Sequence, residues 1–165
     1  MIVALDVDYE DPEATAAAVL FAQWADGEPA REVTARVENV APYEPGAFFR
    51  RELPCLRAVL AKIGEELDVI VIDGYVWLGD DEHPGLGAHL YESLGRKIPV
   101  VGVAKTPFRD VGSAVAITRG KSANPLFVTA AGIDVNEAAR SIREMHGPYR
   151  IPTLLARVDR LCRGM

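Results

Sequence analysis

Three short apolar runs in the sequence each end abruptly in a charged residue. Continuous β-branched runs of this length, bounded by turn signals, are typical of buried strands in a partly parallel sheet. Ligands of open α/β sheets bind outside the carboxyl ends of such strands. We therefore expect the three charged residues to converge on one crevice. The runs with their charged ends are Ile2–Leu5 with Asp6, Val69–Ile72 with Asp73, and Val100–Ala104 with Lys105.

A hairpin signal places two more strands beside the first. Asp26-Gly27 separates Ala14–Trp24 from the alternating segment Arg31–Val40, which predicts that the first three strands form an antiparallel meander. Apolar residues then recur at three- and four-residue steps through Gly46–Leu67, which predicts a helix. Pro54 either places the start of that helix at about residue 53 or kinks it there.

The remaining elements complete one domain over residues 1–165, since no repeat or linker divides the chain. Three antiparallel strands followed by alternating helices and strands predict an α/β fold of the ribonuclease H-like type. Its mixed five-stranded sheet, three antiparallel strands and then parallel ones, would be flanked by helices on both faces. We further expect a helix near Gly87–Leu94, a hairpin of Ala114–Arg119 with Leu126–Thr129, and helices at Val135–Met145, with Asp134 as N-cap, and at Thr153–Cys162.

Composition and charge narrow the classes of protein. The net charge is −6, yet residues 1–95 hold 6 Lys and Arg against 19 Asp and Glu, and residues 96–165 hold 12 against 5. Such a split can place carboxylates beside a basic wall, as an enzyme that holds metal ions and attracts phosphates requires. Cys55 and Cys162 lack the spacing of a zinc or redox motif and are expected in the core. With no apolar run of about 18 residues and no basic leader, we expect a soluble, cytoplasmic protein without a membrane partner.

Carboxylates at the ends of neighbouring strands suggest phosphodiester hydrolysis. Two Mg²⁺ ions held by hard oxygen donors can activate water and neutralise the charge that develops on the phosphate. Asp6 and Asp73 would share such ions, with Glu52 and Asp159 as candidates to complete the site. Each of these last two residues also has a structural interpretation. Glu52 is favoured by the dipole in a first helical turn, and Asp159 could pair with neighbouring arginines on a solvated helix face.

Several motifs, taken in order along nearly the whole chain, resemble the endonuclease V family. The Pro-Tyr-x-Pro-Gly segment and the strand that ends in Gly-Val-Ala-Lys are together fairly specific, whereas each alone would be weak. The matching segments are Ala4–Asp6, Pro42–Gly46 followed by Glu52, Val71–Gly74, His83-Pro84, Ile98-Pro99 through Gly102–Lys105, and Arg150–Pro152.

The resemblance implies a nuclease that cuts DNA or RNA on the 3′ side of inosine, one nucleotide removed, and leaves a 3′-hydroxyl. It implies Mg²⁺, with Mn²⁺ as a substitute, on Asp6, Glu52 and Asp73, with a fourth position near Asp159. Lys105 would be the active-site lysine, and Tyr43, in its proline-flanked segment, would part the strand as a base is extruded. The implied nucleic-acid contacts are Tyr43, Pro45, Gly46, Gly74, His83 and Lys105.

One segment departs from the family pattern and keeps other functions open. Tyr75–Glu82 is longer and more acidic than the Gly-rich stretch that usually lies beside the inosine pocket. The chain could therefore be a non-catalytic nucleic-acid-binding homologue that retains the scaffold, or a small α/β protein that binds a nucleotide. A minor alternative is a zinc site of His83 and His89 with Asp80 or Asp81. The sequence leaves the oligomeric state open, with a monomer slightly favoured.

Overall fold

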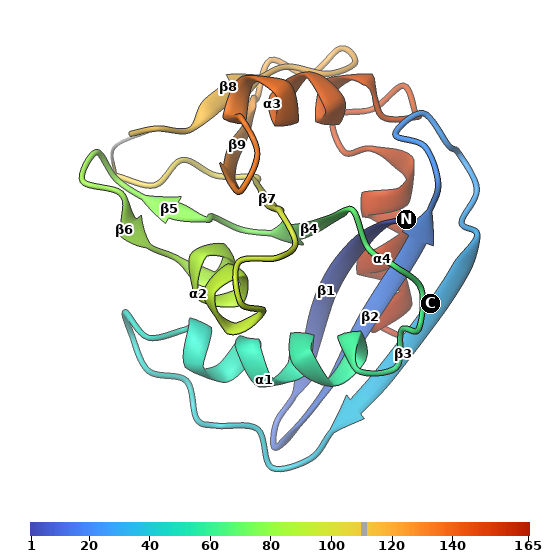
Figure 1. Ribbon diagram of the computed structural model, residues 1–165, viewed down its shortest axis with the longest axis vertical. Helices are drawn as coiled ribbons and strands as arrows, with labels where there is room; N and C mark the ends of the chain where they lie inside the picture. The colour runs from blue at the N-terminus through green and yellow to red at the C-terminus, as the bar shows by residue number, and fades with distance from the viewer. Residues whose placement is uncertain (110–111) are drawn as a thin grey trace.

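The structure is a computed structural model that describes residues 1–109 and 112–165 (Figure 1). Two further groups of three strands follow the opening three, each group is followed by a helix, and the last two helices are consecutive. The strands are β1 (Ile2–Glu10), β2 (Glu13–Phe21), β3 (Arg31–Val37), β4 (Val69–Asp73), β5 (Trp77–Leu78), β6 (His83–Pro84), β7 (Val100–Ala104), β8 (Val115–Ile117) and β9 (Leu126–Ala131). The helices are α1 (Phe49–Leu60), α2 (Leu86–Ser93), α3 (Val135–Glu144) and α4 (Thr153–Cys162).

The main sheet has the mixed, ribonuclease H-like topology predicted from the sequence. Its strand order is β3-β2-β1-β4-β7-β9-β8. The first three strands form the antiparallel meander. Strand β4 then pairs parallel with β1, and β7 pairs parallel with β4. The predicted number of five strands is wrong, because β9 pairs antiparallel with β7 and β8 with β9, which extends the sheet to seven strands. The predicted hairpin thus exists but belongs to the main sheet.

Two local predictions differ from the structure. Asp26-Gly27 does not form a two-residue turn, because β2 ends at Phe21 and residues 22–30 form a longer loop. Within that loop the Asp26 carboxylate accepts hydrogen bonds from the backbone N–H groups of Ala22 and Gln23 at 3.1 and 2.9 Å. The acidic side chain therefore organises the loop by satisfying free backbone donors, as Asp commonly does in turns.

The first helix is shorter than the apolar pattern indicated. It spans Phe49–Leu60 and so begins before residue 53, with Pro54 inside it. Pro54 is the sixth of the twelve helical residues, past the first turn, so it removes one backbone donor from the hydrogen-bond ladder. The remaining turns and the packed apolar face offset this loss. The small β5–β6 ribbon was not predicted at all, since each strand has only two residues.

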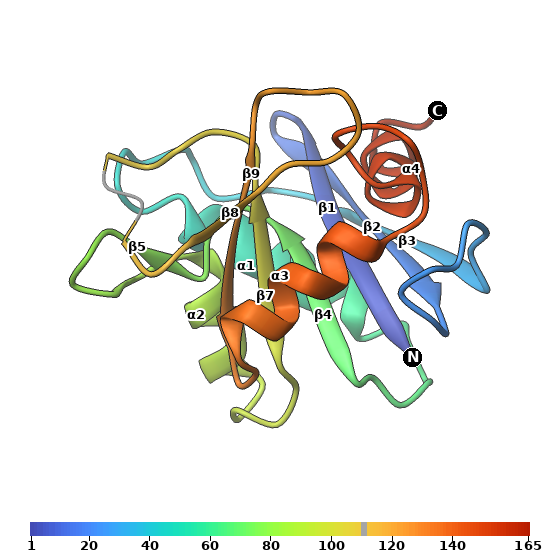
Figure 2. The same ribbon diagram turned by 90° about the horizontal axis from the view of Figure 1, so that it is seen from above.

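Helices cover both faces of the sheet, as Figure 2 shows. Alternate residues of β1 point to opposite sides, so that Ala4 packs in the layer under α3 and α4, and Val3 packs in the layer under α1 and α2. Cys162 and Cys55 are free thiols buried in these two layers respectively, as expected. Over the described ranges, no helix has the length and apolar character that crossing a membrane requires.

The N-cap of α3 provides a direct test of how local sequence fixes this fold. Asp134 accepts hydrogen bonds from the backbone N–H groups of Asn136 and Glu137, both at 3.0 Å, which confirms the predicted cap. Asp134→Ala should lower the free energy of unfolding by about 1 kcal/mol, whereas Asp134→Ser should cost much less. Urea denaturation of the two variants measures the difference, and equal losses would show that the cap does not hold the helix start.

Candidate active site

The register of the parallel strands brings two distant aspartates side by side. Leu5 pairs with Ile72 at the last parallel step between β1 and β4, so the next residues along, Asp6 and Asp73, are neighbours. Asp73 in turn pairs with Val103 of β7. Strand β1 does not end at Asp6, as the apolar run suggested, but continues to Glu10 in antiparallel pairing with β2 alone.

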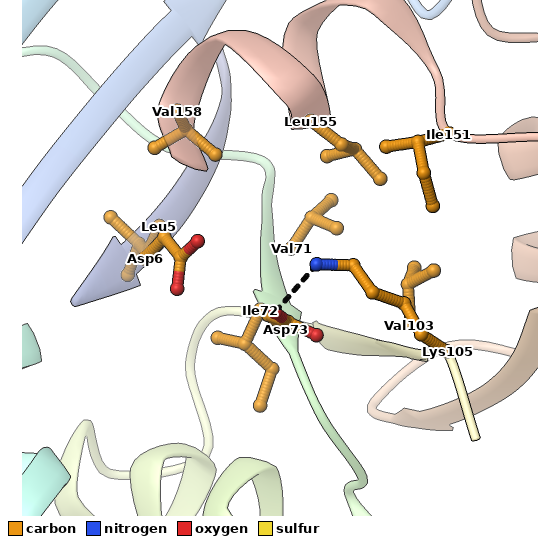
Figure 3. A pocket seen from close by; sticks show the side chains of 10 residues that line it. All are labelled: Leu5, Asp6, Val71, Ile72, Asp73, Val103, Lys105, Ile151, Leu155 and Val158. Atoms are coloured by element: carbon orange, nitrogen blue, oxygen red, sulfur yellow. Dashed lines mark hydrogen bonds and ion pairs between the residues drawn. The ribbon is translucent and has the colours of Figure 1, made fainter. Parts of the chain in front are cut away.

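Asp6, Asp73 and Lys105 line one pocket (Figure 3). Asp73 lies on the same side of its strand as Val71, and Lys105 follows Val103 in the same alternation, so their side chains share the face covered by α4. The Lys105 ammonium donates to Asp73 Oδ2 at 3.1 Å. The apolar wall of this pocket comes from α4 and the segment before it, with Ile151, Leu155 and Val158.

Asp6 is the buried member of the cluster. Its residue surface is only 9% exposed, and Oδ1 accepts a hydrogen bond from the backbone N–H of Val7 at 2.9 Å. Burial, and then the nearby charge of Asp73, raise the pKa of Asp6 to about 7. A carboxyl group in this position favours either a proton or a cation.

Glu52 reaches the same carboxylates from the opposite face of the sheet. It lies on α1, is buried, and has its pKa raised to about 8 by burial and by the charges of Asp6 and Asp73. Its position in the first turn of the helix agrees with the dipole interpretation. The influence of Asp6 and Asp73 on its pKa shows, in addition, that Glu52 is close to both aspartates and not on a solvated helix face.

Asp159 lies on α4 close enough to act electrostatically on the cluster. Its charge contributes to the raised pKa of Asp6 and of the Lys105 ammonium. It forms an ion pair with Arg163 at 3.0 Å, not with the arginines at 157 and 160 that the sequence suggested, since Arg157 binds Glu32 instead. Asp159 is therefore at the margin of the carboxylate group, tied to a neighbouring arginine.

A second and larger pocket, of about 480 Å³, opens on the α1 side and meets the first at Asp73. Phe49 and His89 stack at its wall with ring centroids 3.7 Å apart. The Tyr75 hydroxyl donates to the Thr106 carbonyl at 2.7 Å and accepts from the Phe108 N–H at 3.0 Å, which fixes another wall. Of the predicted residues, Gly46, Glu52, Asp73, Gly74 and His83 line this pocket.

The proline-flanked aromatic segment lies beside the second pocket. Tyr43 is 60% exposed, and its ring centroid is 6.1 Å from that of Phe48, a residue that lines the pocket. Tyr43 therefore does not cover the edge of the core. It projects from a loop whose two prolines, Pro42 and Pro45, restrict the backbone.

The donor set suits a hard divalent cation. Burial and the charge of Asp73 raise the pKa of Asp6, and burial with the charges of Asp6 and Asp73 raises the pKa of Glu52. All three side chains offer only oxygen ligands. Within the described residues, no three His, Cys, Asp or Glu side chains stand close enough together to enclose a metal ion. This holds for the set of Asp6, Glu52, Asp73 and Asp159 and also for the zinc site considered at His83 and His89. Mg²⁺ keeps several waters and commonly takes only one or two protein carboxylates with substrate phosphate oxygens, so such an enclosure is not required.

Two arginines that sequence reasoning left without a role support this edge of the sheet. Arg119 is buried and donates to a series of backbone carbonyls in the segment between α3 and α4. Arg150 donates to the carbonyls of Lys105 and, at 2.9 Å, of Pro125. The available signal for Arg150 was its place in the Arg150-Ile151-Pro152 motif, whereas no pattern distinguished Arg119 from a surface arginine.

Comparisons of both the sequence and the structure with known proteins find similarity to endonuclease V. The sequence model of the Endonuclease V family matches residues 1–121. The chain is 31% identical to the endonuclease V of Streptomyces avermitilis over 98% of its own length and 79% of that protein. The crystal structure of the endonuclease V from that organism superposes with a TM-score of 0.77 at 28% identity, over 99% of this chain and 79% of the other.

A more distant structure shares the fold. The endonuclease V of Ciona intestinalis, solved in complex with a 24mer DNA containing an inosine followed by a ribo-adenosine, superposes with a TM-score of 0.78 at 19% identity. The match covers 99% of this chain and 84% of that one.

The raised pKa values predict an unusual dependence of stability on pH. Between the ordinary carboxyl pKa near 4 and the folded-state values of about 7 and 8, the folded protein binds more protons than the unfolded chain, so the stability from these two groups falls as pH rises. In metal-free buffer at pH 8, Asp6→Asn and Glu52→Gln should each raise the free energy of unfolding by on the order of 1–3 kcal/mol, and the gain should vanish near pH 4.

Urea denaturation across this pH range measures the effect, with the exposed Glu28→Gln as the matched control. A gain that is the same at pH 4 and pH 8, or that the control also shows, would contradict the electrostatic account.

Proposed function

This chain belongs to the endonuclease V family, and from that premise we propose that it is a metal-dependent endonuclease. It hydrolyses a phosphodiester on the 3′ side of inosine or deoxyinosine in nucleic acid and so serves nucleic-acid repair. One observation carries the proposal. Asp6 and Asp73 stand side by side at the ends of a parallel strand pair, in a pocket whose lining contains one cation, Lys105.

Asp6 and Asp73, with Glu52 and Asp159 nearby, would hold Mg²⁺, or Mn²⁺ in its place. When bound, the metal supplies an activated water and neutralises the charge that develops on the phosphate. A cation among these carboxylates would offset both the burial and the mutual repulsion that raise the pKa of Asp6 and Glu52. The negative charges that are unfavourable in the metal-free protein would thereby contribute to binding the ion.

Lys105 acts on the phosphate. Its side chain is 42% exposed and its ammonium lies 3.1 Å from Asp73 Oδ2, so it can exchange that partner for a phosphate oxygen without moving far. The ammonium is a compact point charge, which suits a phosphate whose orientation changes during the reaction. Arg150 holds the main chain of Lys105 in place by donating to its carbonyl.

The second pocket receives the inosine base. Its volume of about 480 Å³ and its aromatic walls suit a purine that has left the base stack, and Asp73 places that pocket next to the carboxylates. Tyr43, exposed beside Phe48 of that pocket, is pushed into the stack where the base is extruded, which offsets part of the unstacking cost of a few kcal/mol. That the Ciona intestinalis protein was solved with inosine-containing DNA supports this substrate.

The acidic segment at residues 80–82 does not stand over the carboxylate pocket. Asp80 and Asp81 line a hollow at the tip of the β5–β6 ribbon that shares Leu78 and His83 with the second pocket. Neither aspartate lines the carboxylate pocket, so their repulsion of a phosphate backbone acts beside the second pocket. The acids still favour the second candidate, a homologue that binds nucleic acid without cutting it.

A nicking assay distinguishes these functions. Wild-type protein with Mg²⁺ should cut an oligonucleotide that contains one inosine, in DNA or RNA, and leave the same strand without inosine intact. Asp6→Ala or Asp73→Ala should lower the rate more than about 100-fold, since even the outer partners of metal ligands cost about 10–100-fold. Glu28→Ala, a change at an exposed acid, should cut at the wild-type rate, and circular dichroism should show all variants folded.

Other outcomes identify the alternatives. Absence of nicking with both Mg²⁺ and Mn²⁺ would defeat the enzymatic proposal. Inosine-specific binding without nicking would then favour the non-catalytic homologue. Binding that is independent of oligonucleotide length would favour a pocket for a free nucleotide.

A further inference from the structure

We propose that Tyr149 is a stacking platform for one base of the substrate strand, presented by a loop that the buried Arg119 holds rigid. The inference rests on the proposed nuclease function and adds to it a nucleotide position on the α4 side of the site. Tyr43, by contrast, belongs to the α1 side. Residues 146–150, between α3 and α4, are called the tyrosine loop below.

The ring of Tyr149 is open to solvent. The residue is 75% exposed, more than either Tyr43 or Phe48 in the segment beside the base pocket. Among the described residues its hydroxyl takes no hydrogen bond, and only its backbone carbonyl is engaged. Single exposed aromatic residues are common, so the exposure gains meaning from the loop that carries it.

Arg119 lies beneath this loop and donates hydrogen bonds to its backbone carbonyls. Its side chain is 6% exposed and donates to the carbonyls of Met145 at 2.5 Å, Gly147 at 3.1 Å and Tyr149 at 2.6 Å. A guanidinium is costly to bury unless its donors are satisfied, and here backbone carbonyls of one short segment satisfy them. The fold therefore places a buried charge under a surface loop whose most prominent side chain points away from the core.

Contacts at the middle and at the start of the tyrosine loop add to its rigidity. Gly120 has φ +61°, and a Cβ there would lie 2.3 Å from the Pro148 carbonyl oxygen, so the two backbones touch. At the start, His146 Nδ1 lies 2.9 Å from Thr153 Oγ1, and the Thr153 N–H donates to the His146 carbonyl at 2.9 Å. The loop is already ordered in the folded protein. A base that stacks on Tyr149 therefore binds without the additional entropic cost of ordering the loop.

The loop also borders the carboxylate pocket. Arg150, the residue after Tyr149, donates to the Lys105 carbonyl, and Ile151 lines the pocket beside Lys105 (Figure 3). Lys121 follows the glycine that touches Pro148. Arg150 is engaged with backbone carbonyls, so Lys105 and the exposed Lys121 remain as cations to follow a phosphate backbone on this side. Proteins bind single strands by combining such cations with an exposed ring that stacks on a base.

Kinetics of ring variants give the first test. Tyr149→Ala should raise KM for an inosine-containing oligonucleotide by about 5- to 100-fold, as expected for the loss of one stacked base, and kcat should fall by a smaller factor. Tyr149→Phe should restore KM, whereas Tyr149→Leu, which is apolar but lacks a π face, should not. All three changes leave the carbonyl bonded by Arg119 untouched, so melting temperatures should match that of the wild type.

An abasic scan locates the stacked base. With divalent ions chelated to prevent cutting, strands carrying one abasic nucleotide at successive positions around the inosine are bound to wild type and to Tyr149→Ala. At one position outside the inosine itself, the abasic site should weaken binding to wild type and leave binding to the variant unchanged. A merely structural role of Tyr149 would not produce such a position-specific coupling.

Each failure has a distinct meaning. If wild type nicks inosine-containing strands but no position couples to Tyr149, or if Tyr149→Leu matches Tyr149→Phe, the platform is wrong and the nuclease function stands. If wild type neither binds nor nicks such strands, the proposed function fails, and the platform fails with it.

Discussion

The parallel pairing of β1 with β4, and of β4 with β7, is the constraint on which the site depends. It aligns the carboxyl ends of strands that lie far apart in the sequence, so that Asp6 and Asp73 become neighbours and Lys105 arrives beside them. Side chains alternate along a strand, so a slip of one residue in either pairing would turn one of these groups to the opposite face of the sheet. The apolar runs that fix the register are therefore as necessary to the site as the charged residues.

The same pairing brings several carboxylates together, and their negative charges repel one another. Asp6 and Glu52 are buried on opposite faces of the sheet beside Asp73, and burial with neighbouring negative charge gives both a stronger affinity for protons than ordinary carboxyl groups have. Buried like charges are unfavourable in a protein without a ligand, and a hydrophobic replacement would relieve them. Their presence is physically reasonable if the functional state includes a cation, because the ion converts the repulsion into binding energy.

The sequence predicted those parts of the fold that local pattern controls. Continuous apolar runs such as Val69–Ile72 identified the central strands, and the Asp134 cap located the start of α3. Parts that depend on tertiary contacts were missed or misjudged. Strands β8 and β9 read as a separate hairpin because nothing in their sequence shows that β9 pairs with β7.

In the site, too, residues marked by a local sequence pattern were predicted, and residues that act through tertiary contacts were not. The motif residues Asp6, Asp73 and Lys105 were found because each terminates an apolar run, and the structure brings them into one pocket. Arg119 was not found, because an arginine whose partners are backbone carbonyls of a distant loop leaves no periodic or motif signal. The pocket walls at Phe49 and Tyr75 were missed for the same reason, since ring stacking and hydroxyl bridges arise only in the folded chain.

Anomalous diffraction from a crystal soaked with Mn²⁺ would show whether Asp6 and Asp73 hold one cation together, because the signal of the ion reports its position without reference to activity. We expect a peak within coordination distance of both carboxylates. Strong Mn²⁺ peaks elsewhere, with those two carboxylates unliganded at saturating metal, would contradict this expectation.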